Sequence, residues 1–388
     1  MEGSSIALIL GGLTFLASLI SVEAGLSVAI IEMGMGIIGG NFLGLHTTPW
    51  IDYLAGLGSI VLTFLAGAEV DLDVMKNKFR ESLLIGGISF LVPFAGAFAF
   101  AYWVAGWSLQ ASEIAGIALS TTSLAVVYAV LVETGLTDTE LGKTIMASCF
   151  ITDFGTALAL SLLFAQANWW TLVFVLASAI LIILVPRIVP AIFQRYGDRV
   201  IEPEIKFLTL TFLAFMFLAT IGASHAVLPV FIFGLALSRT FSRHRQVQHR
   251  LRVVAFALLT PIFFIKAGMN VSLREVYLNL GMLAFFFGVK IAAKFAGVYP
   301  LSVAYVPKGA TYTTLLMSTG LTFGTISSMF GLTAGIINSA QFSILVTTVV
   351  LSAIIPTFFA QRWFQPKPEE LPGRIPMASS PMTSFGED

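Results

Sequence analysis

MASCFITDFGTAL, residues 146–158, is the centre of a stretch from Leu141 to Ala165 that is long enough to cross a lipid bilayer. Asp153 stands in the middle of this stretch, with mostly apolar residues on both sides. An ionised carboxylate at the bilayer midplane costs several kcal/mol, so it is retained where it faces a cavity or a partner. We therefore expect Asp153 to serve the passage of a cation or a proton. The alternative is an acid that hydrogen-bonds to a neighbouring helix and serves packing alone.

The composition around this stretch is that of a membrane protein. Of the 388 residues, 57% are hydrophobic and only 11% are charged, whereas soluble domains carry roughly 25% charged residues. The lipid bilayer is therefore the expected surrounding. The net charge of zero argues against nucleic acid as a partner. The single cysteine, Cys149, excludes an internal disulfide and a cysteine-rich metal site, and we expect no cofactor.

Apolar stretches of spanning length recur along the whole chain and predict an all-α membrane protein. Charge clusters, glycines and prolines divide them into thirteen candidate transmembrane helices. These are 5–22, 26–45, 51–70, 83–106, 111–133, 141–165, 168–193, 205–222, 226–240, 253–270, 277–303, 309–331 and 336–363.

The distribution of basic residues predicts the orientation. With thirteen spans, seventeen of the 21 lysines and arginines fall in loops or the tail on one side, and only Arg274 falls on the other. The positive-inside rule then places the amino terminus outside and the carboxyl terminus in the cytoplasm. The segment 365–388 is rich in Pro, Ser, Met and Gly without apolar periodicity, which predicts a disordered cytoplasmic tail.

Two spans carry hydroxyl and glycine clusters at mid-length, which lets a helix unwind and turn free carbonyls toward an ion. Aligning the Gly-Leu-Thr runs at 135–137 and 331–333 superposes these two spans. We expect inverted repeats of six helices each, with two crossed discontinuous helices. The alternative is that small and hydroxyl residues only permit close helix packing. The residues concerned are Ser120, Thr121, Thr122 and Ser123 in the first span, and Ser318, Thr319 and Gly320 in the second.

Four further charged residues interrupt apolar spans. Lys290 and Lys294 are four residues apart and so share one helix face. A buried lysine must find an anion, lose its proton or extend to the interface, and either lysine would serve as a charge partner of Asp153. Glu69 ends the third span and Glu32 lies near the middle of the second. Both are candidates for an access route for ions, although interfacial or packing roles are equally consistent with their positions.

These residues together resemble the cation:proton antiporters of the Kef and Nap type, a branch of the monovalent cation:proton antiporter superfamily. The matching pieces follow the family order over nearly the whole chain. They are FLAGAEVD (64–71), STTS (120–123), ETGL (133–136), Thr152-Asp153, LPVFIFGLALS (228–238), PIFF (261–264), Gly268 and Lys294.

The resemblance implies a homodimer of a prokaryotic inner membrane in which a fixed dimerisation unit supports a moving core that works like an elevator. It makes Asp153 the carboxylate that binds a cation or protons, and Lys294 the basic residue facing it. Electrogenic relatives carry two adjacent acids, whereas Thr152 occupies the first position here. The implied divisions are dimerisation domain 1–82 and 194–270, core 83–165 and 271–364, and linker helix 166–193.

The function expected on this basis is secondary active Na⁺/H⁺ antiport, with Asp153, Thr152, Thr122 and Ser123 binding the ion. The rival closest in chemistry is a K⁺/H⁺ antiporter of the Kef type. A sodium-coupled organic anion symporter would need a polar substrate pocket that the sequence does not indicate. An intramembrane hydrolase would need a second acid or a Ser/His arrangement at the depth of Asp153. A cation channel is a further alternative.

Overall fold

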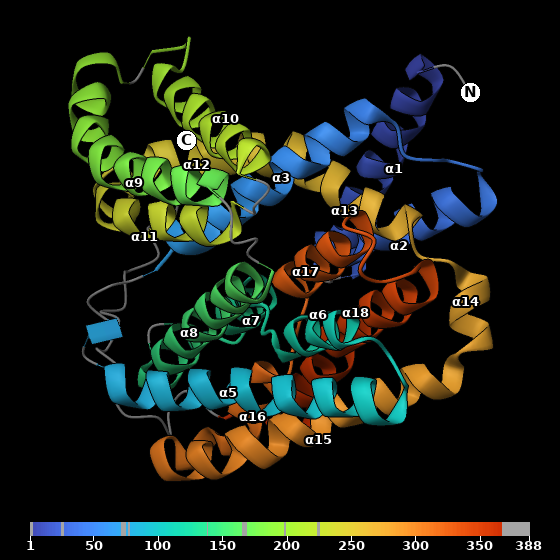
Figure 1. The fold of residues 1–388 in the computed structure, drawn as a ribbon. Coiled ribbons are helices and arrows are strands. Elements are labelled where there is room, and N and C mark those ends of the chain that lie inside the picture. The colour runs from blue at the N-terminus through green and yellow to red at the C-terminus, as the bar shows by residue number, and fades with distance from the viewer. Residues whose placement is uncertain are drawn as a thin grey trace, which may run out of the picture.

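The computed structural model describes residues 3–24, 27–70, 75–76, 78–137, 139–164, 169–197, 199–222 and 226–366, and the expected tail lies almost entirely outside this part. Every regular element in the described residues is helical (Figure 1). The helices are α1 (Gly3–Ala24), α2 (Val28–Phe42), α3 (Pro49–Ala68), α5 (Phe79–Ala99), α6 (Leu109–Ser120), α7 (Leu124–Glu133), α8 (Glu140–Leu163), α9 (Trp169–Tyr196), α10 (Pro203–Ile221), α11 (Val227–Arg243), α12 (Arg245–Val254), α13 (Thr260–Met269), α14 (Leu273–Leu278), α15 (Leu280–Tyr305), α16 (Ala310–Met317), α17 (Thr322–Thr333) and α18 (Ser339–Trp363), with π turns Phe100–Val104 and Ala255–Leu259 and a 3₁₀ turn Pro307–Gly309.

The length and hydropathy of these helices make the chain a multi-pass membrane protein. Within the described residues, 11 helical segments are long and apolar enough to cross a bilayer. The expected second and ninth spans correspond to α2 and α11, which have 15 and 17 residues. A typical span has about 20 residues. The count of thirteen therefore stays a prediction.

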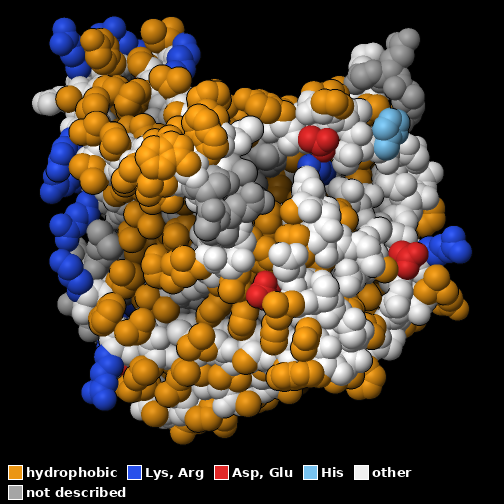
Figure 2. Space-filling model, viewed as in Figure 1, with side chains coloured by type: hydrophobic (Ala, Val, Ile, Leu, Met, Phe, Trp, Pro, Cys, Tyr) orange, Lys and Arg blue, Asp and Glu red, His pale blue; other side chains and the backbone are white. Residues whose placement is uncertain are grey.

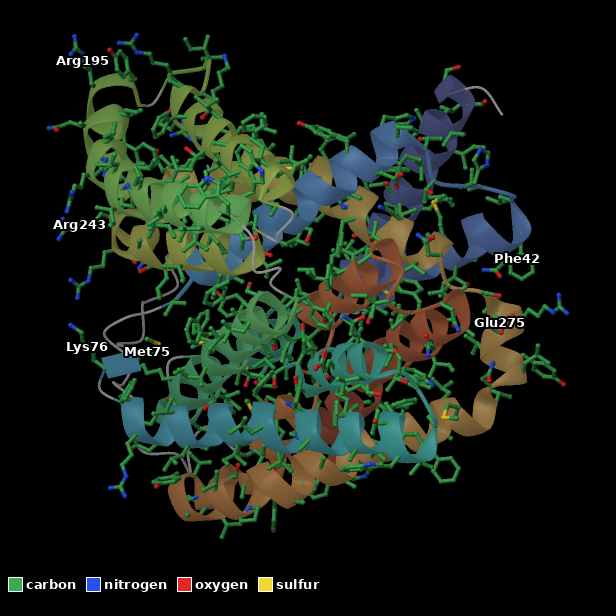
Figure 3. All side chains as sticks on the ribbon, in the orientation of Figure 1. Phe42, Met75, Lys76, Arg195, Arg243 and Glu275 are labelled. Atoms are coloured by element: carbon green, nitrogen blue, oxygen red, sulfur yellow. The ribbon has the colours of Figure 1, made fainter. Side chains whose placement is uncertain are left out.

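Most of the exposed basic side chains in the view of Figure 2 lie along one edge of the molecule. Figure 2 shows Lys and Arg gathered along the left edge, while hydrophobic side chains cover much of the remaining face. Arg195, Arg243 and Lys76 lie at this edge, and Phe42 and Glu275 lie at the opposite edge (Figure 3). This separation is what the one-sided charge pattern requires. Which edge faces the cytoplasm stays a prediction.

Glycines bring two pairs of helices into backbone contact. A Cβ at Gly36 of α2 would overlap the carbonyl oxygen of Ile265 in α13, and a Cβ at Gly268 of α13 would overlap the carbonyl oxygen of Met33. Small residues at such crossings allow helices to approach closely within a membrane. The same reciprocal arrangement joins α3 to α11. There, Gly67 faces the carbonyl oxygen of Phe231 and Gly234 faces that of Phe64.

Two of the membrane segments are interrupted near their middle. Residues 121–123 separate α6 from α7, and residues 318–321 separate α16 from α17. Hydroxyl side chains explain these breaks, because they offer the backbone local hydrogen bonds that compete with the helix. Thr121 Oγ1 donates to the carbonyl oxygen of Ala118 at 3.0 Å, and Thr319 Oγ1 donates to that of Leu316 at 2.7 Å.

The two interruptions are in direct contact. Thr122 Oγ1 donates to the carbonyl oxygen of Met317 at 2.9 Å, and the backbone N–H of Ser123 donates to the carbonyl oxygen of Thr319 at 3.2 Å. Two helix ends and two helix starts therefore meet at one buried place inside the helix group α5–α8 and α15–α18 (Figure 1).

Candidate functional site

Asp153 lies beside this meeting point. It occupies α8, where Thr139 caps the first turn by accepting a hydrogen bond from the N–H of Gly142 at 3.0 Å. The side chain is 2% exposed, and its Oδ1 has no hydrogen-bond partner among the described residues. It lines a cavity of about 500 Å³ that also touches Thr122. A carboxylate oxygen without a protein partner, next to a cavity, is free to take a cation or a proton.

Lys294 is held at the first interruption. Its side chain is fully buried on α15, and Nζ donates to Ser89 Oγ and the Ser120 carbonyl oxygen, both at 2.8 Å, and to Thr122 Oγ1 at 3.1 Å. The Ser120 carbonyl belongs to the last turn of α6, where helix carbonyls lack intrahelical partners and carry partial negative charge. The lysine thus joins α5, α6 and α15 at the break.

The expected contact between Asp153 and a lysine is indirect in this structure. In the described part of the chain, neither Lys290 nor Lys294 makes an ion pair with Asp153. Thr122 lies between them, since it accepts from Lys294 and lines the cavity that Asp153 lines. Lys294 does not pair with Asp153 directly because two hydroxyls and a helix-end carbonyl already accept the hydrogen bonds of its ammonium group.

Lys290 reaches the second interruption. It is fully buried, and its Nζ has no hydrogen-bond partner among the described residues. A Cβ at Gly320 would overlap this Nζ and would lie 2.9 Å from Thr121 Oγ1. A side chain at position 320 would therefore displace the end of Lys290. The two lysines, one turn apart, lie at different places in the site, with Lys294 bonded at the first interruption and Lys290 Nζ close to Gly320 of the second.

The remaining hydroxyls of the expected site point in different directions. Thr152 Oγ1 lies within hydrogen-bonding distance of the carbonyl oxygens of Ser148 at 3.0 Å and Gly86 of α5 at 3.1 Å. It is absent from the lining of the Asp153 cavity. The role of Thr152 as an ion ligand stays a prediction, because a hydroxyl that donates to a carbonyl oxygen keeps its own lone pairs. Three others bond within their own segments: Ser123 accepts from Val126 N–H, Ser318 donates to the carbonyl of Thr314, and Ser120 donates to that of Ile117.

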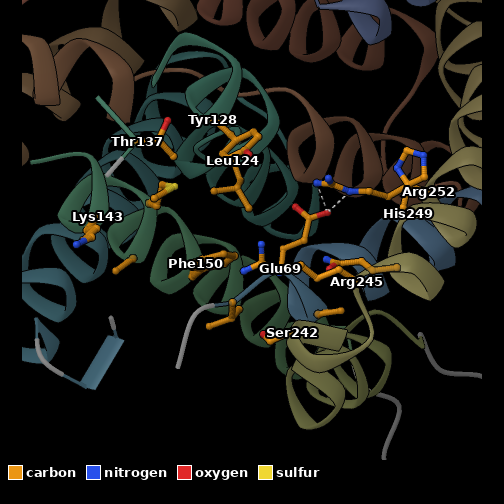
Figure 4. Close-up of a pocket in the computed structure, with 15 residues that line it drawn as sticks. Glu69, Leu124, Tyr128, Thr137, Lys143, Phe150, Ser242, Arg245, His249 and Arg252 are labelled. Carbon is orange, nitrogen blue, oxygen red and sulfur yellow. Dashed lines mark hydrogen bonds and ion pairs between the residues drawn. The ribbon is translucent and has the colours of Figure 1, made fainter. Parts of the chain in front are cut away.

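Of the two acids considered for an access route, only Glu69 lines the Asp153 cavity. It follows α3 directly, and its Oε1 accepts hydrogen bonds from Arg252 Nε at 2.9 Å and Nη2 at 2.7 Å (Figure 4). Glu32 is 1% exposed on α2, and its Oε2 has no partner in the part of the chain that the structure describes. The cavity thus runs from Asp153 to an ion pair at the arginine-rich edge.

Three residues of the site escaped the sequence analysis. Ser89 binds Lys294, and Arg252 and His249 line the Asp153 cavity. A single serine in an apolar span, such as Ser89, does not indicate from the sequence that it binds a lysine. Arg252 and His249 belong to α12, whose alternating basic and apolar residues predict a partly buried helix, and this pattern was the available indication.

Comparison with known proteins assigns this architecture to a family. The sequence pattern of the transmembrane sodium/hydrogen exchangers matches residues 6–364. The chain belongs to this sodium/hydrogen exchanger family. Its members are transmembrane ion antiporters, so the protein is a transporter and not an enzyme.

Relatives from archaea and bacteria agree with this assignment. A probable Na⁺/H⁺ antiporter of Methanocaldococcus jannaschii is 27% identical over 289 residues, which cover 71% of this chain and 73% of the relative. A Na⁺/H⁺ antiporter of Enterococcus hirae is 25% identical over 74% of this chain and 78% of the relative. The Na⁺/H⁺-K⁺ antiporter GerN of Bacillus cereus is 26% identical over 67% and 69%.

A solved structure shares the fold. The sodium proton antiporter MjNhaP1 of Methanocaldococcus jannaschii superposes with a TM-score of 0.67 over 94% of this chain and 100% of that chain, at 17% sequence identity. This similarity concerns the fold alone. It does not distinguish the Kef and Nap branch from other branches of the superfamily.

Proposed function

We propose that the protein exchanges Na⁺ for H⁺ across the membrane by alternating access, with Asp153 as the single group that binds either ion. The observation that carries this proposal is the Asp153 carboxylate, which is buried in the lining of a cavity that Thr122 of the first interruption also lines, with Oδ1 unbonded among the described residues. Membership of the exchanger family and the Na⁺/H⁺ antiporters among the relatives support it.

The coupling follows from the cost of burying charge. An ionised carboxylate without a partner is too costly to move through a low-dielectric barrier. Asp153 therefore crosses only when a cation or a proton neutralises it, and each crossing in one direction requires the other ion for the return. The requirement that Asp153 be neutral during each crossing is therefore sufficient to make exchange obligatory.

The proposed ion ligands are Asp153 and the interruption beside it. Thr122 lies closest to this role because it lines the same cavity. Ser123 of the first break and Thr319 of the second break meet through the backbone, and each adds a hydroxyl oxygen at its own break. A hard monovalent cation prefers such oxygen ligands. Thr152 remains a candidate ligand, ranked after Thr122 because it donates to α5 and lies outside the lining of the cavity.

The reciprocal glycine contacts support an inverted repeat. In both helix pairs, α2 with α13 and α3 with α11, each glycine faces the carbonyl oxygen three residues before the partner glycine. In the expected repeat, the second span (α2) corresponds to the ninth (α11), and the third span (α3) corresponds to the tenth (α13). Replacing each helix of one pair by its counterpart therefore gives the other pair. We therefore retain thirteen spans, the core of 83–165 and 271–364, and the dimerisation domain of 1–82 and 194–270 joined by the linker helix 166–193.

Potassium is the second candidate substrate. The relative GerN carries both Na⁺ and K⁺ in its name, and Thr152 replaces the adjacent acid of electrogenic relatives. We place Na⁺ first because the relatives from Methanocaldococcus jannaschii and Enterococcus hirae are named as Na⁺/H⁺ antiporters.

The decisive experiment measures proton movement in proteoliposomes loaded with a pH-sensitive dye. Addition of Na⁺ to the purified wild-type protein should dissipate an imposed pH gradient, and parallel additions of K⁺ and Li⁺ establish the preference. Asp153→Asn keeps the shape of the side chain and should reduce exchange to the background of empty liposomes. Exchange that persists in a well-folded Asp153→Asn protein overturns the proposal.

A further inference from the structure

A second cavity adjoins the one that holds Asp153. It has a volume of about 520 Å³, within the usual range of roughly 300–1,000 Å³ for small-ligand sites. Both cavities share Glu69, Leu124 and Tyr128 as well as His249 and Arg252. Figure 4 shows Lys143 on one side of this second cavity and Arg245 on the other. We call it the basic pocket, defined by Lys143, Arg245, His249 and Arg252.

Positive charge dominates the described lining of the basic pocket. Glu69 is the one carboxylate in that lining, and Arg252 already binds it with two hydrogen bonds. Glu140 lies nearby, 3.9 Å from Lys143 Nζ, but is closer to Lys78 at 3.0 Å. Arg245 and His249 have no hydrogen-bonded partner among the described residues. Among the described residues, the pocket therefore offers the donors of Lys143, Arg245 and His249 and a single carboxylate that is already bonded.

Cation transport does not explain this arrangement. An excess of fixed positive charge repels Na⁺ from the mouth of its own route. The positive-inside rule explains arginines at this edge in general, such as the exposed Arg239 and Arg243, which do not line the pocket. It does not explain why Lys143 of α8 faces the same cavity as Arg245, His249 and Arg252 of α12. Convergent guanidinium and ammonium groups are the typical recognition set for phosphate oxygens.

Residues of both the proposed core and the proposed dimerisation domain line the basic pocket. Lys143 and Tyr128 come from α8 and α7 of the proposed core, whereas Arg245, His249 and Arg252 come from α12 of the proposed dimerisation domain. A ligand that binds both sides would fix the core against the other domain. Because exchange requires the core to move, such a ligand would inhibit transport.

We propose that the basic pocket binds a small polyvalent oxyanion of the phosphate or pyrophosphate class from the side predicted to be cytoplasmic, and that this binding inhibits exchange by bridging core and dimerisation domain. The inhibitory step rests on the proposed function, since it uses alternating access at Asp153. The phosphate group can come from a soluble metabolite or from a lipid headgroup.

The first test measures binding in the absence of transport. Thermal unfolding of the purified protein is followed in detergent with increasing pyrophosphate, and choline chloride is added to keep the ionic strength constant. Pyrophosphate should raise the unfolding temperature of the wild type and of Asp153→Asn equally. A failed antiport proposal would leave this binding intact, so the two proposals are tested separately.

The second test measures inhibition. In everted membrane vesicles, external pyrophosphate should reduce Na⁺-driven proton movement. Arg245→Gln and Lys143→Gln should each raise the half-inhibitory concentration about tenfold, the effect of losing one charge-assisted hydrogen bond. Both variants should keep basal exchange. Arg243→Gln, which removes a neighbouring exposed arginine outside the pocket, is the matched control and should respond like the wild type.

The outcomes separate the sources of the phosphate group. Reconstitution in phosphatidylglycerol and in phosphatidylcholine is compared for the wild type and the two pocket variants. Lipid-dependent inhibition that disappears in both variants, without an effect of pyrophosphate, assigns the pocket to a headgroup. Inhibition by pyrophosphate that choline chloride reproduces, or that both variants retain in full, overturns the proposal.

Discussion

Lys290 and Lys294 show how differently two lysines of one helix face can be bound. Lys294 makes three hydrogen bonds at the first interruption, whereas Lys290 makes none with the described residues. A hydrogen bond to a charged group contributes about 1.5–3 kcal/mol, and a buried charge without a partner destabilises. The two side chains should therefore affect stability in opposite directions.

We predict that Lys294→Gln lowers the unfolding temperature of the purified protein clearly, while Lys290→Gln leaves it unchanged or raises it. Thermal unfolding in a single detergent measures both. The reason is that glutamine at 294 leaves the Ser120 carbonyl and two hydroxyls with fewer donors, whereas glutamine at 290 removes a charge that nothing compensates. Equal destabilisation by both variants would contradict this account.

Gly320 gives a second prediction at the same scale. A methyl group at this position overlaps Lys290 Nζ and crowds Thr121 Oγ1. Gly320→Ala should therefore reduce exchange by displacing the end of the lysine, while the yield of folded protein stays near that of the wild type. In the double variant Gly320→Ala with Lys290→Met the overlap is gone, so it should exchange like Lys290→Met alone. A single Gly320→Ala variant with wild-type exchange would show that the close approach is unimportant.

At the scale of helices, the sequence predicted the interruptions and missed the partners of the residues around them. Hydroxyl runs such as 120–123 compete locally with helical hydrogen bonds, so the break depends on nearby residues alone. The pairing of Glu69 with Arg252 joins residues separated by 183 positions, and Lys294 meets Ser89 across 205 positions. Such partners depend on how the helices pack, which no local pattern specifies. The burial of Asp153 was predictable because an acid in the middle of an apolar span lies at membrane depth wherever the helix packs.

The glycine contacts predict a sharp difference within α2. Gly36→Ala places a methyl group into the carbonyl oxygen of Ile265, and such overpacking typically costs about 1–3 kcal/mol. Gly34→Ala is the matched control, because a Cβ there meets no atom within 4 Å, and alanine favours the helix by up to about 1 kcal/mol. The yield of folded protein in gel filtration should fall for Gly36→Ala alone. Equal yields would argue against backbone contact of α2 with α13.

At the scale of the whole molecule, the cavities differ between the two edges. Asp153 lines the cavity that opens beside Glu69 and Arg252. A separate cavity of about 660 Å³ is lined by Asp52 and Lys266, whose side chains pair at 2.9 Å, and it does not include Asp153. The carboxylate proposed to bind the ion thus shares a cavity with the Glu69–Arg252 pair. In the proposed orientation this is the inward-open state, in which Na⁺ and H⁺ compete from the cytoplasm.

That competition gives a prediction for the transport cycle as a whole. A carboxylate binds a cation only when it is deprotonated, so acidification must weaken Na⁺ binding. If Asp153 alone exchanges one proton for one Na⁺, the Na⁺ concentration for half-maximal exchange should rise about tenfold for each unit of decreasing pH in the acidic range. Proteoliposome assays at a series of pH values measure this slope.

A slope near a hundredfold per pH unit would mean that a second proton-binding group takes part. The Lys290→Gln variant would then show whether Lys290 is that group. A half-maximal concentration independent of pH would contradict competition at a shared carboxylate.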